Sequence, residues 1–121
     1  MGDLSKDFSR SEFVCLDGCG ADAVSPVLVS KLQAMRDDLG QYLVITSGVR
    51  CTTQNAKVGG KPDSAHLNGH AADISAMDSR LRMEIVKAAV HAGISRIGIG
   101  KNFVHVDVDE SKPQNVMWLY A

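Results

Sequence analysis

The chain has 121 residues, of which 45% are hydrophobic and 22% are charged, and its formal net charge is −1. This size and composition are typical of one globular domain, which we expect to cover residues 1–121. A nucleic-acid-binding protein usually carries a basic face, so the near-neutral charge argues against a nucleic-acid partner. The sequence shows no apolar run long enough to span a bilayer and no apolar core of a secretory signal near its start. We therefore expect a monomer that is synthesised in the cytoplasm and has no membrane partner.

The three cysteines are Cys15, Cys19 and Cys51. Their odd number excludes a framework in which every cysteine is in a disulfide. In a reducing cytoplasm three free thiols are the default. Two alternatives stay open. One is a structural metal site, for which the sequence shows three thiols but no obvious fourth ligand, and the other is a single disulfide formed after export.

The first half of the chain predicts one long helix between loops. Residues Ser9-Arg10-Ser11-Glu12 fit a capping box that opens a short helix. A serine and Pro26 then suit the start of a longer helix, whose apolar stripe continues until a glycine ends it at position 40. Residues 42–46 predict a short strand. The stretch 48–69 is rich in Gly, Thr and Asn and predicts a long loop of the kind that carries function.

The second half predicts three strands and a helix. Residues 71–74 are apolar except for one aspartate and indicate a strand, and residues 79–92 have the caps and periodicity of a helix. Residues 94–100 and 103–109 form two further predicted strands joined by a tight turn. Together these elements predict an α+β fold, with a small, mainly antiparallel sheet and helices packed on one side of it.

The last predicted strand alternates cleanly between two kinds of side chain. Val104, Val106 and Val108 face one way, and the other face carries Phe103, His105, Asp107 and Asp109. The strand thus presents a polar face that includes a histidine.

Three residues of the second half could hold a metal ion. His66 lies in the long loop, Asp73 lies inside an apolar strand, and His105 alternates with valines. A carboxylate in an apolar strand must be exposed, paired, protonated or bound to metal. Two imidazoles and one carboxylate are the three protein ligands that a catalytic zinc keeps when its fourth position stays open. Spacing alone leaves the competing interpretation open, in which His66 is a solvated loop residue.

The same residues carry a family resemblance. The pattern Ser64-x-His66-x-x-Gly69-x-Ala71-x-Asp73-Ile74, together with His105-Val106-Asp107, resembles the zinc D-alanyl-D-alanine carboxypeptidase family. That family includes the vancomycin-resistance D,D-dipeptidases and small phage endolysins. The segment Ile45-Thr46-Ser47-Gly48-Val49-Arg50 is similar to the family's strand that ends in Ser-Gly-Tyr-Arg, with Val49 in place of the usual Tyr. The resemblance covers nearly the whole chain and implies the hedgehog/D,D-peptidase-like fold.

The resemblance also implies a cofactor and ligands. It implies that Zn²⁺ is bound by His66, Asp73 and His105. Arg50 matches an arginine that binds the substrate carboxylate or the developing oxyanion, for which its planar, permanently charged group is suited. Ser64 matches a position near the substrate, although a small loop residue is an equally good account.

The general base is where the chain departs from the family. Many members place an acid three residues before the last ligand, and this chain has Asn102 there. Asp107 shares a strand face with His105 and is our candidate general base. The alternative is that Asp107 orients His105 as a partner of a zinc ligand.

From the resemblance we expect a zinc-dependent peptidase that hydrolyses peptidoglycan stem peptides. The bond would be D-Ala-D-Ala for a carboxypeptidase or L-Ala-D-Glu for an endopeptidase. Such an enzyme would reach the cell wall, in the periplasm, after release or lysis, and would serve phage lysis. The alternative is a zinc-binding module without hydrolytic activity on the same fold, for example a phage tail or wall-binding component.

Overall fold

The structure, a computed structural model, describes residues 2–120. In chain order its elements are η1 (Arg10–Glu12), α1 (Pro26–Leu39), β1 (Ile45–Ser47), α2 (Thr52–Lys57), η2 (Ala65–Asn68), β2 (Ala71–Ser75), α3 (Ser79–His91), β3 (Arg96–Ile99), β4 (Phe103–Asp107) and β5 (Val116–Leu119). The five strands form one sheet in the order β1-β2-β4-β3-β5. All neighbours are antiparallel except β3 and β5, which are parallel. The predicted α+β class with a mainly antiparallel sheet is confirmed.

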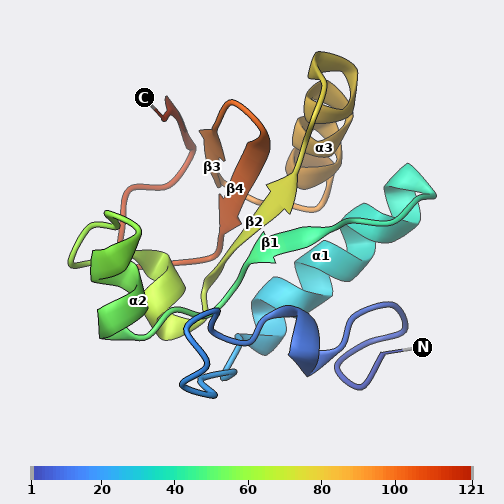
Figure 1. Ribbon diagram of the computed structural model, residues 1–121. Coiled ribbons are helices and arrows are strands. Elements are labelled where there is room, and N and C mark those ends of the chain that lie inside the picture. The colour runs from blue at the N-terminus through green and yellow to red at the C-terminus, as the bar shows by residue number, and fades with distance from the viewer. Residues whose placement is uncertain (1, 121) are drawn as a thin grey trace.

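The two long helices begin and end at residues suited to those places. The Ser25 side chain accepts a hydrogen bond from the Leu28 amide at the start of α1, and Asp78 does the same for Leu81 at the start of α3. Gly40 ends α1 in the left-handed region, at φ 70°. The helices α1 and α3 contact each other on the same side of the sheet (Figure 1).

The core lies between these helices and the sheet. Its fully buried members include Leu28, Leu32, Met35, Ile74, Ile85, Val104 and Val106. Along β4 the valines therefore point to the helices, as their alternation predicts. The polar side chains of β2 and β4 consequently project from the opposite face.

The register across the sheet aligns these polar side chains. Asp73 on β2 lies directly opposite His105 on β4, and His105 in turn lies opposite Gly98 on β3. Asp107 lies opposite Arg96. Neighbouring strands thus place the candidate ligands in one row and a buried charge pair in the next.

The fold differs from the sequence-based expectations in several places, among them the strand predicted at 42–46, which forms at Ile45–Ser47. The predicted loop 48–69 contains the short helices α2 and η2, and residues 116–119 form strand β5. Strand β4 ends at Asp107 rather than at 109. The Asp107 carboxylate accepts a hydrogen bond from the Asp109 amide, which turns the chain away from the ladder. Among the described residues no helix is long and apolar enough to cross a membrane.

Candidate metal centre

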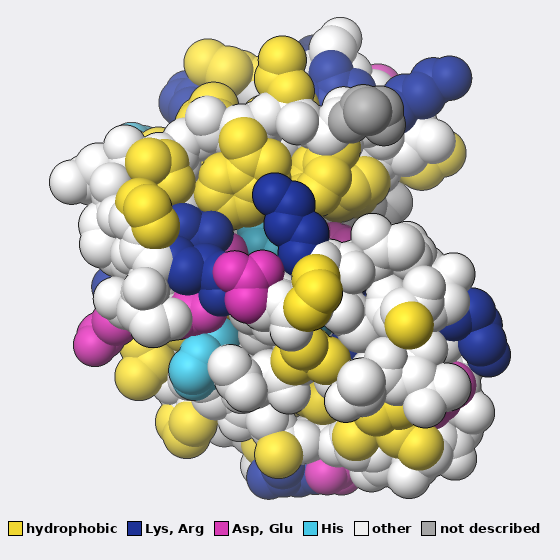
Figure 2. Space-filling model, turned by 90° about the vertical axis from the view of Figure 1, so that its left-hand side faces the viewer, with side chains coloured by type: hydrophobic (Ala, Val, Ile, Leu, Met, Phe, Trp, Pro, Cys, Tyr) yellow, Lys and Arg dark blue, Asp and Glu magenta, His cyan; other side chains and the backbone are white. Residues whose placement is uncertain are grey.

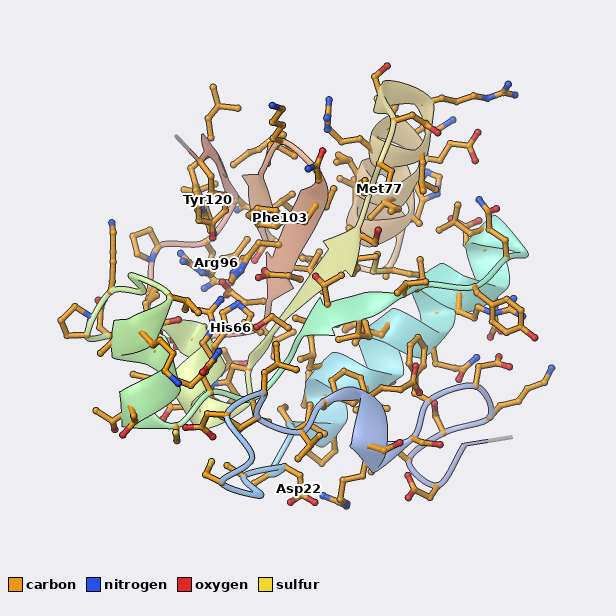
Figure 3. All side chains as sticks on the ribbon, in the orientation of Figure 1. Asp22, His66, Met77, Arg96, Phe103 and Tyr120 are labelled. Carbon is orange, nitrogen blue, oxygen red and sulfur yellow. The ribbon has the colours of Figure 1, made fainter. Side chains whose placement is uncertain are left out.

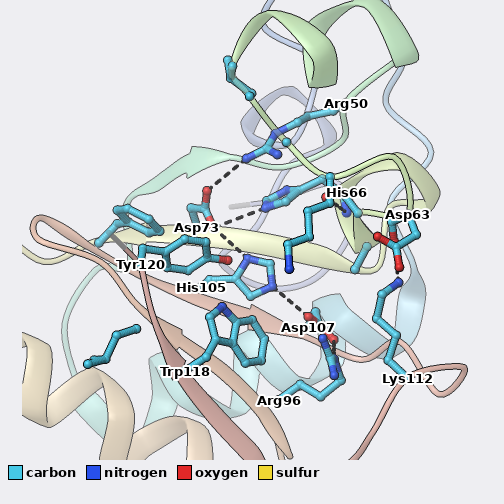
Figure 4. Close-up of a pocket in the computed structure, with 18 of the residues that line it drawn as sticks. Arg50, Asp63, His66, Asp73, Arg96, His105, Asp107, Lys112, Trp118 and Tyr120 are labelled. Carbon is cyan, nitrogen blue, oxygen red and sulfur yellow. Dashed lines mark hydrogen bonds and ion pairs between the residues drawn. The ribbon is translucent and has the colours of Figure 1, made fainter.

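The structure brings His66, Asp73 and His105 together. One ligand atom from each lies within 4.8 Å of the other two. Asp73 Oδ1 is 3.3 Å from His66 Nε2 and 3.0 Å from His105 Nδ1 (Figure 4). The three residues are only 2%, 8% and 5% exposed, respectively. Residues from η2, β2 and β4 therefore form one compact, nearly buried group of two imidazoles and a carboxylate.

The orientation of His66 leaves one ring nitrogen for a ligand. Its Nδ1 lies 2.7 Å from the Gly48 carbonyl oxygen, to which it can only donate a hydrogen bond. In the neutral ring Nε2 then carries a lone pair. That nitrogen is buried, faces Asp73, and makes no hydrogen bond. A lone pair that faces a carboxylate oxygen is unfavourable unless a cation lies between them, so this arrangement fits a bound metal ion.

The turn that carries His66 is fixed by its two ends. Ser64 Oγ accepts a hydrogen bond from the His66 amide and caps η2. Gly69 ends η2 with φ 70°, and a Cβ at this position would collide with the Ala23 carbonyl oxygen. The glycine of the sequence motif is thus required by both the backbone angle and the close approach of the chain.

His105 is held from its other side by Asp107. His105 Nε2 lies 2.7 Å from Asp107 Oδ2, and Asp107 Oδ1 accepts a 2.7 Å hydrogen bond from Arg96 Nε. When Nε2 donates to Asp107, Nδ1 becomes the acceptor and faces Asp73. A carboxylate that orients the imidazole of a metal ligand is a common supporting arrangement. Asp107 is therefore well placed for the orienting role.

The charges of the group shift its proton affinities. Burial lowers the pKa of His105, but the carboxylates of Asp107 and Asp73 outweigh burial, and the net pKa is raised. Burial raises the pKa of Asp73, but the adjacent imidazoles of His105 and His66 outweigh burial and lower the pKa. The pKa of Asp107 is lowered for the same reasons, with His105 as its main partner. Both carboxylates are thus held ionised, and a proton on His105 competes with a metal ion.

Arg50 lies beside the group and is not a solvated surface cation. Its side chain is 15% exposed, and one guanidinium nitrogen is 3.4 Å from Asp73 Oδ2. The other two nitrogens donate to Ser47 Oγ and Asn55 Oδ1, both at 3.3 Å. These contacts fix the planar group at the edge of the candidate metal centre.

A cavity of about 770 Å³ opens over these residues. In Figure 2 it is a hollow in which histidine lies beneath basic and hydrophobic side chains. His66, Arg96, Phe103 and Tyr120 gather at it, whereas Asp22 and Met77 lie elsewhere (Figure 3). Ser64 also lines the cavity, as its match to a substrate-side position predicts.

The aromatic side chains of Trp118, on β5, and of Tyr120, directly after it, form one wall of the cavity. The Trp118 ring centre lies 5.4 Å from that of His105, and the Tyr120 ring centre lies 6.1 Å from it. A Cβ on Gly98 would stand 2.5 Å from the Tyr120 ring and 2.6 Å from the Trp118 ring. The missing side chain at Gly98 therefore makes room for both rings.

The mouth of the cavity is bridged by a lysine. Lys112 Nζ donates to the Asp63 carbonyl at 2.5 Å and to the Asp109 carboxylate at 2.7 Å. Asn102, by contrast, lies exposed in the β3–β4 turn and does not line the cavity. The lack of an acid at position 102 therefore removes no carboxylate from this site.

Several residues of the site could not be recognised beforehand. Arg96 carries no motif, and only the β3–β4 register pairs it with Asp107. The Gly48 carbonyl is a backbone group, so side-chain patterns do not reveal it. His70, although it stands inside the motif, is not part of the group formed by His66, Asp73 and His105.

This α+β domain has three candidate ligands close together and a half-buried arginine beside them, a residue set that matches the protein ligands of a catalytic metal centre. The chain belongs to the Peptidase M15 family, whose model matches residues 6–107. Over 78 residues it is 38% identical to a zinc D-Ala-D-Ala carboxypeptidase from Streptomyces albus G. That match covers 64% of this chain but only 30% of the relative's length. The family resemblance seen in the sequence is confirmed.

Proposed function

We propose that this chain is a zinc-dependent peptidase that hydrolyses peptidoglycan stem peptides, with His66, Asp73 and His105 as the zinc ligands. The observation that carries the proposal is the buried, unpartnered Nε2 of His66 facing Asp73 and His105 beneath an open cavity. Nitrogen and carboxylate oxygen are ligands that zinc accepts. Membership of a peptidase family and the similarity to a zinc carboxypeptidase support the same conclusion.

When bound, zinc would supply Lewis-acid polarisation of the scissile carbonyl and activation of water. The protein's own residues would do the rest. Arg50 would bind the carboxylate of the peptide or the charge that develops on the carbonyl oxygen. The wall formed by Trp118 and Tyr120 would exclude water from one side of the peptide.

The proton acceptor has two candidates among the carboxylates that line the cavity. Asp107, our candidate from the sequence, has one oxygen with Arg96 and the other with His105. These contacts support an orienting role for Asp107. Asp63 lines the same cavity and is exposed, so its carboxylate can reach a substrate. Comparing the pH profiles of Asp63→Asn and Asp107→Asn assigns the role, since loss of the base removes the acidic limb of the profile.

The bond cleaved would be D-Ala-D-Ala or L-Ala-D-Glu. The relative's activity supports the first. The resemblance of the sequence to small phage endolysins supports the second and a role in cell-wall degradation during phage lysis. Mass spectrometry of digested peptidoglycan separates the two, because a carboxypeptidase releases free D-alanine and an endopeptidase exposes a new D-glutamyl amino terminus.

The proposal is tested with purified, zinc-loaded protein on intact peptidoglycan and on soluble stem peptides. We expect turnover that His66→Ala abolishes together with the zinc bound by His66, Asp73 and His105. His91→Gln is the matched control, because His91 is a surface histidine paired with Asp38 and far from the cavity. Zinc that is lost on His66→Ala, without turnover of the unsubstituted protein on any wall substrate, would instead establish the alternative, a non-hydrolytic zinc-binding module.

A further inference from the structure

A second group of metal-binding side chains lies outside the cavity. Cys15, Asp17, Cys19 and Cys51 each offer one ligand atom, and these atoms all lie within 4.8 Å of one another. All three thiols are free. None of the four residues lines the cavity described above. Residues 2–120 therefore carry two separate groups with metal-binding chemistry.

The distances within this thiol cluster are close to those around a tetrahedral ion. Cys15 Sγ and Cys51 Sγ are 3.8 Å apart. Sulfurs bonded to zinc at about 2.3 Å in a tetrahedron are separated by about 3.8 Å. The Asp17 oxygens lie 3.3 Å from Cys15 Sγ and 2.9 Å from Cys51 Sγ. A cation would thus need only small side-chain adjustments to contact three donors from two distant segments.

Asp17 is the fourth ligand that the sequence did not reveal. It lies between the cysteines, and its Oδ1 also accepts a hydrogen bond from the Cys19 amide at 2.9 Å. None of the ion pairs formed by residues 2–120 involves Asp17, so no side-chain cation balances its charge. A disulfide between Cys15 and Cys51 would leave this carboxylate without the two thiol donors that now contact it. A cation instead would satisfy all four groups.

We propose that Cys15, Asp17, Cys19 and Cys51 bind a structural Zn²⁺ ion. Thiolates favour zinc over magnesium or calcium, and four protein ligands leave no open position for a substrate. This inference depends on the cysteine cluster alone and not on the proposed peptidase activity.

The place of the cluster in the fold indicates what the ion would do. Cys51 directly follows Arg50, and the preceding residues Gly48 and Val49 contact His66 and Phe13, respectively. An ion that ties Cys51 to the loop around Cys15 would therefore anchor the segment that carries Arg50 and orients His66. The cluster would be a positioning element for the cavity wall.

The experiment measures zinc in the full chain with the other site removed. His66→Ala removes one ligand of the candidate catalytic centre, so the metal that remains reports on the cysteines. We expect about one zinc per chain in this variant, and we expect sulfur-to-cobalt charge-transfer absorption when cobalt replaces zinc. Adding Cys19→Ser, at an exposed position, should abolish both signals. Adding Asp22→Asn, in the same loop but outside the cluster, should leave them unchanged.

A second measurement uses the unsubstituted protein and needs no variant to fold. Zinc should slow the reaction of the three thiols with a thiol reagent at least tenfold relative to chelator-treated protein. Equal thiol reactivity with and without zinc would overturn the proposal in favour of free thiols. A mass lower by two hydrogens, restored by reductant, would overturn it in favour of a disulfide.

Discussion

Replacing Asp107 with asparagine separates its two candidate roles, which are general base and orienting partner of His105. Asp107 Oδ1 accepts hydrogen bonds from Arg96 Nε and the Asp109 amide, whereas Oδ2 has His105 Nε2 as its partner. An asparagine has one acceptor oxygen, and it would keep the two donors at Oδ1. Its amide nitrogen would then face His105 Nε2 and donate to it. The proton of His105 would have to move to Nδ1, the nitrogen that faces Asp73.

The expected loss of zinc affinity follows from the loss of this orientation of His105. Losing the partner that fixes a histidine ligand reduces metal affinity about 10- to 100-fold, which is about 1.4–2.7 kcal/mol. The metal-free protein should also lose up to about 1.5–3 kcal/mol of unfolding free energy, because the charge-assisted hydrogen bonds of the carboxylate are replaced by neutral ones. A competition titration against a chromophoric chelator measures the first quantity, and urea denaturation of chelator-treated protein measures the second.

Asp109→Asn is the matched control for this titration. Asp109 is also a buried carboxylate, but it pairs with Lys112 and not with a histidine. Its substitution should leave zinc affinity within about twofold of the unsubstituted protein. The reasoning is refuted if Asp107→Asn also retains full zinc affinity while its turnover falls by orders of magnitude. That result would make Asp107 the general base.

Three further predictions concern stability and the cavity wall. Gly98→Ala should displace Trp118 and Tyr120, since its Cβ would stand 2.6 Å and 2.5 Å from their rings, respectively. We expect about 1–3 kcal/mol of destabilisation in urea and a higher KM at unchanged zinc content, and an unchanged KM would contradict the assigned wall. Burial raises the pKa of Asp109, but hydrogen bonds from Lys112 and Ser111 outweigh burial and hold the pKa below its ordinary value of 3.8. The stability that this carboxylate contributes is therefore present above pH 3.8 and is lost as the pH falls through the lower pKa of the folded state. Asp109→Asn should therefore flatten the acid limb of a plot of unfolding free energy against pH, and an unaltered slope would show that this carboxylate does not contribute. Leu32→Ala should cost about 2–5 kcal/mol of unfolding free energy because Leu32 is fully buried, whereas Val27→Ala, at an exposed position of the same helix, should cost less than about 1 kcal/mol.

The elements that could be predicted from the sequence are those with strong local signals. The caps and apolar stripe of α1 lie within the segment that forms the helix, so its bounds follow from local chemistry. The alternation in β4 likewise predicts which side chains face the helices. The helix α2 has neither signal, because Thr52–Lys57 has no apolar stripe and its cap residue Cys51 makes no side-chain capping bond. Residues 116–119 form a strand only through pairing with β3, which is a tertiary contact.

The same distinction applies to the candidate site. The candidate ligands could be singled out because they stand in a recognisable motif, and the structure brings them together. Its supporting contacts depend on geometry that spacing does not encode. Gly48 contributes a carbonyl, and Arg96 reaches Asp107 through strand register. Asp17 becomes a candidate ligand only when the chain folds Cys51 against Cys15, 36 residues away.

The contacts of Lys112 at the cavity mouth have a consequence for local opening of the structure. Lys112 joins the loop before η2 to the loop after β4, and both loops lead directly to candidate ligands, His66 and His105. Opening either loop alone would break the contact between Lys112 and the Asp63 carbonyl, so the two loops should open together as one local unfolding unit. Amide hydrogen exchange at Ser64 and Ser111, whose N–H groups are bonded within these loops, should then show a shared opening free energy. The rim of the cavity would fluctuate as one body while the sheet beneath it stays closed.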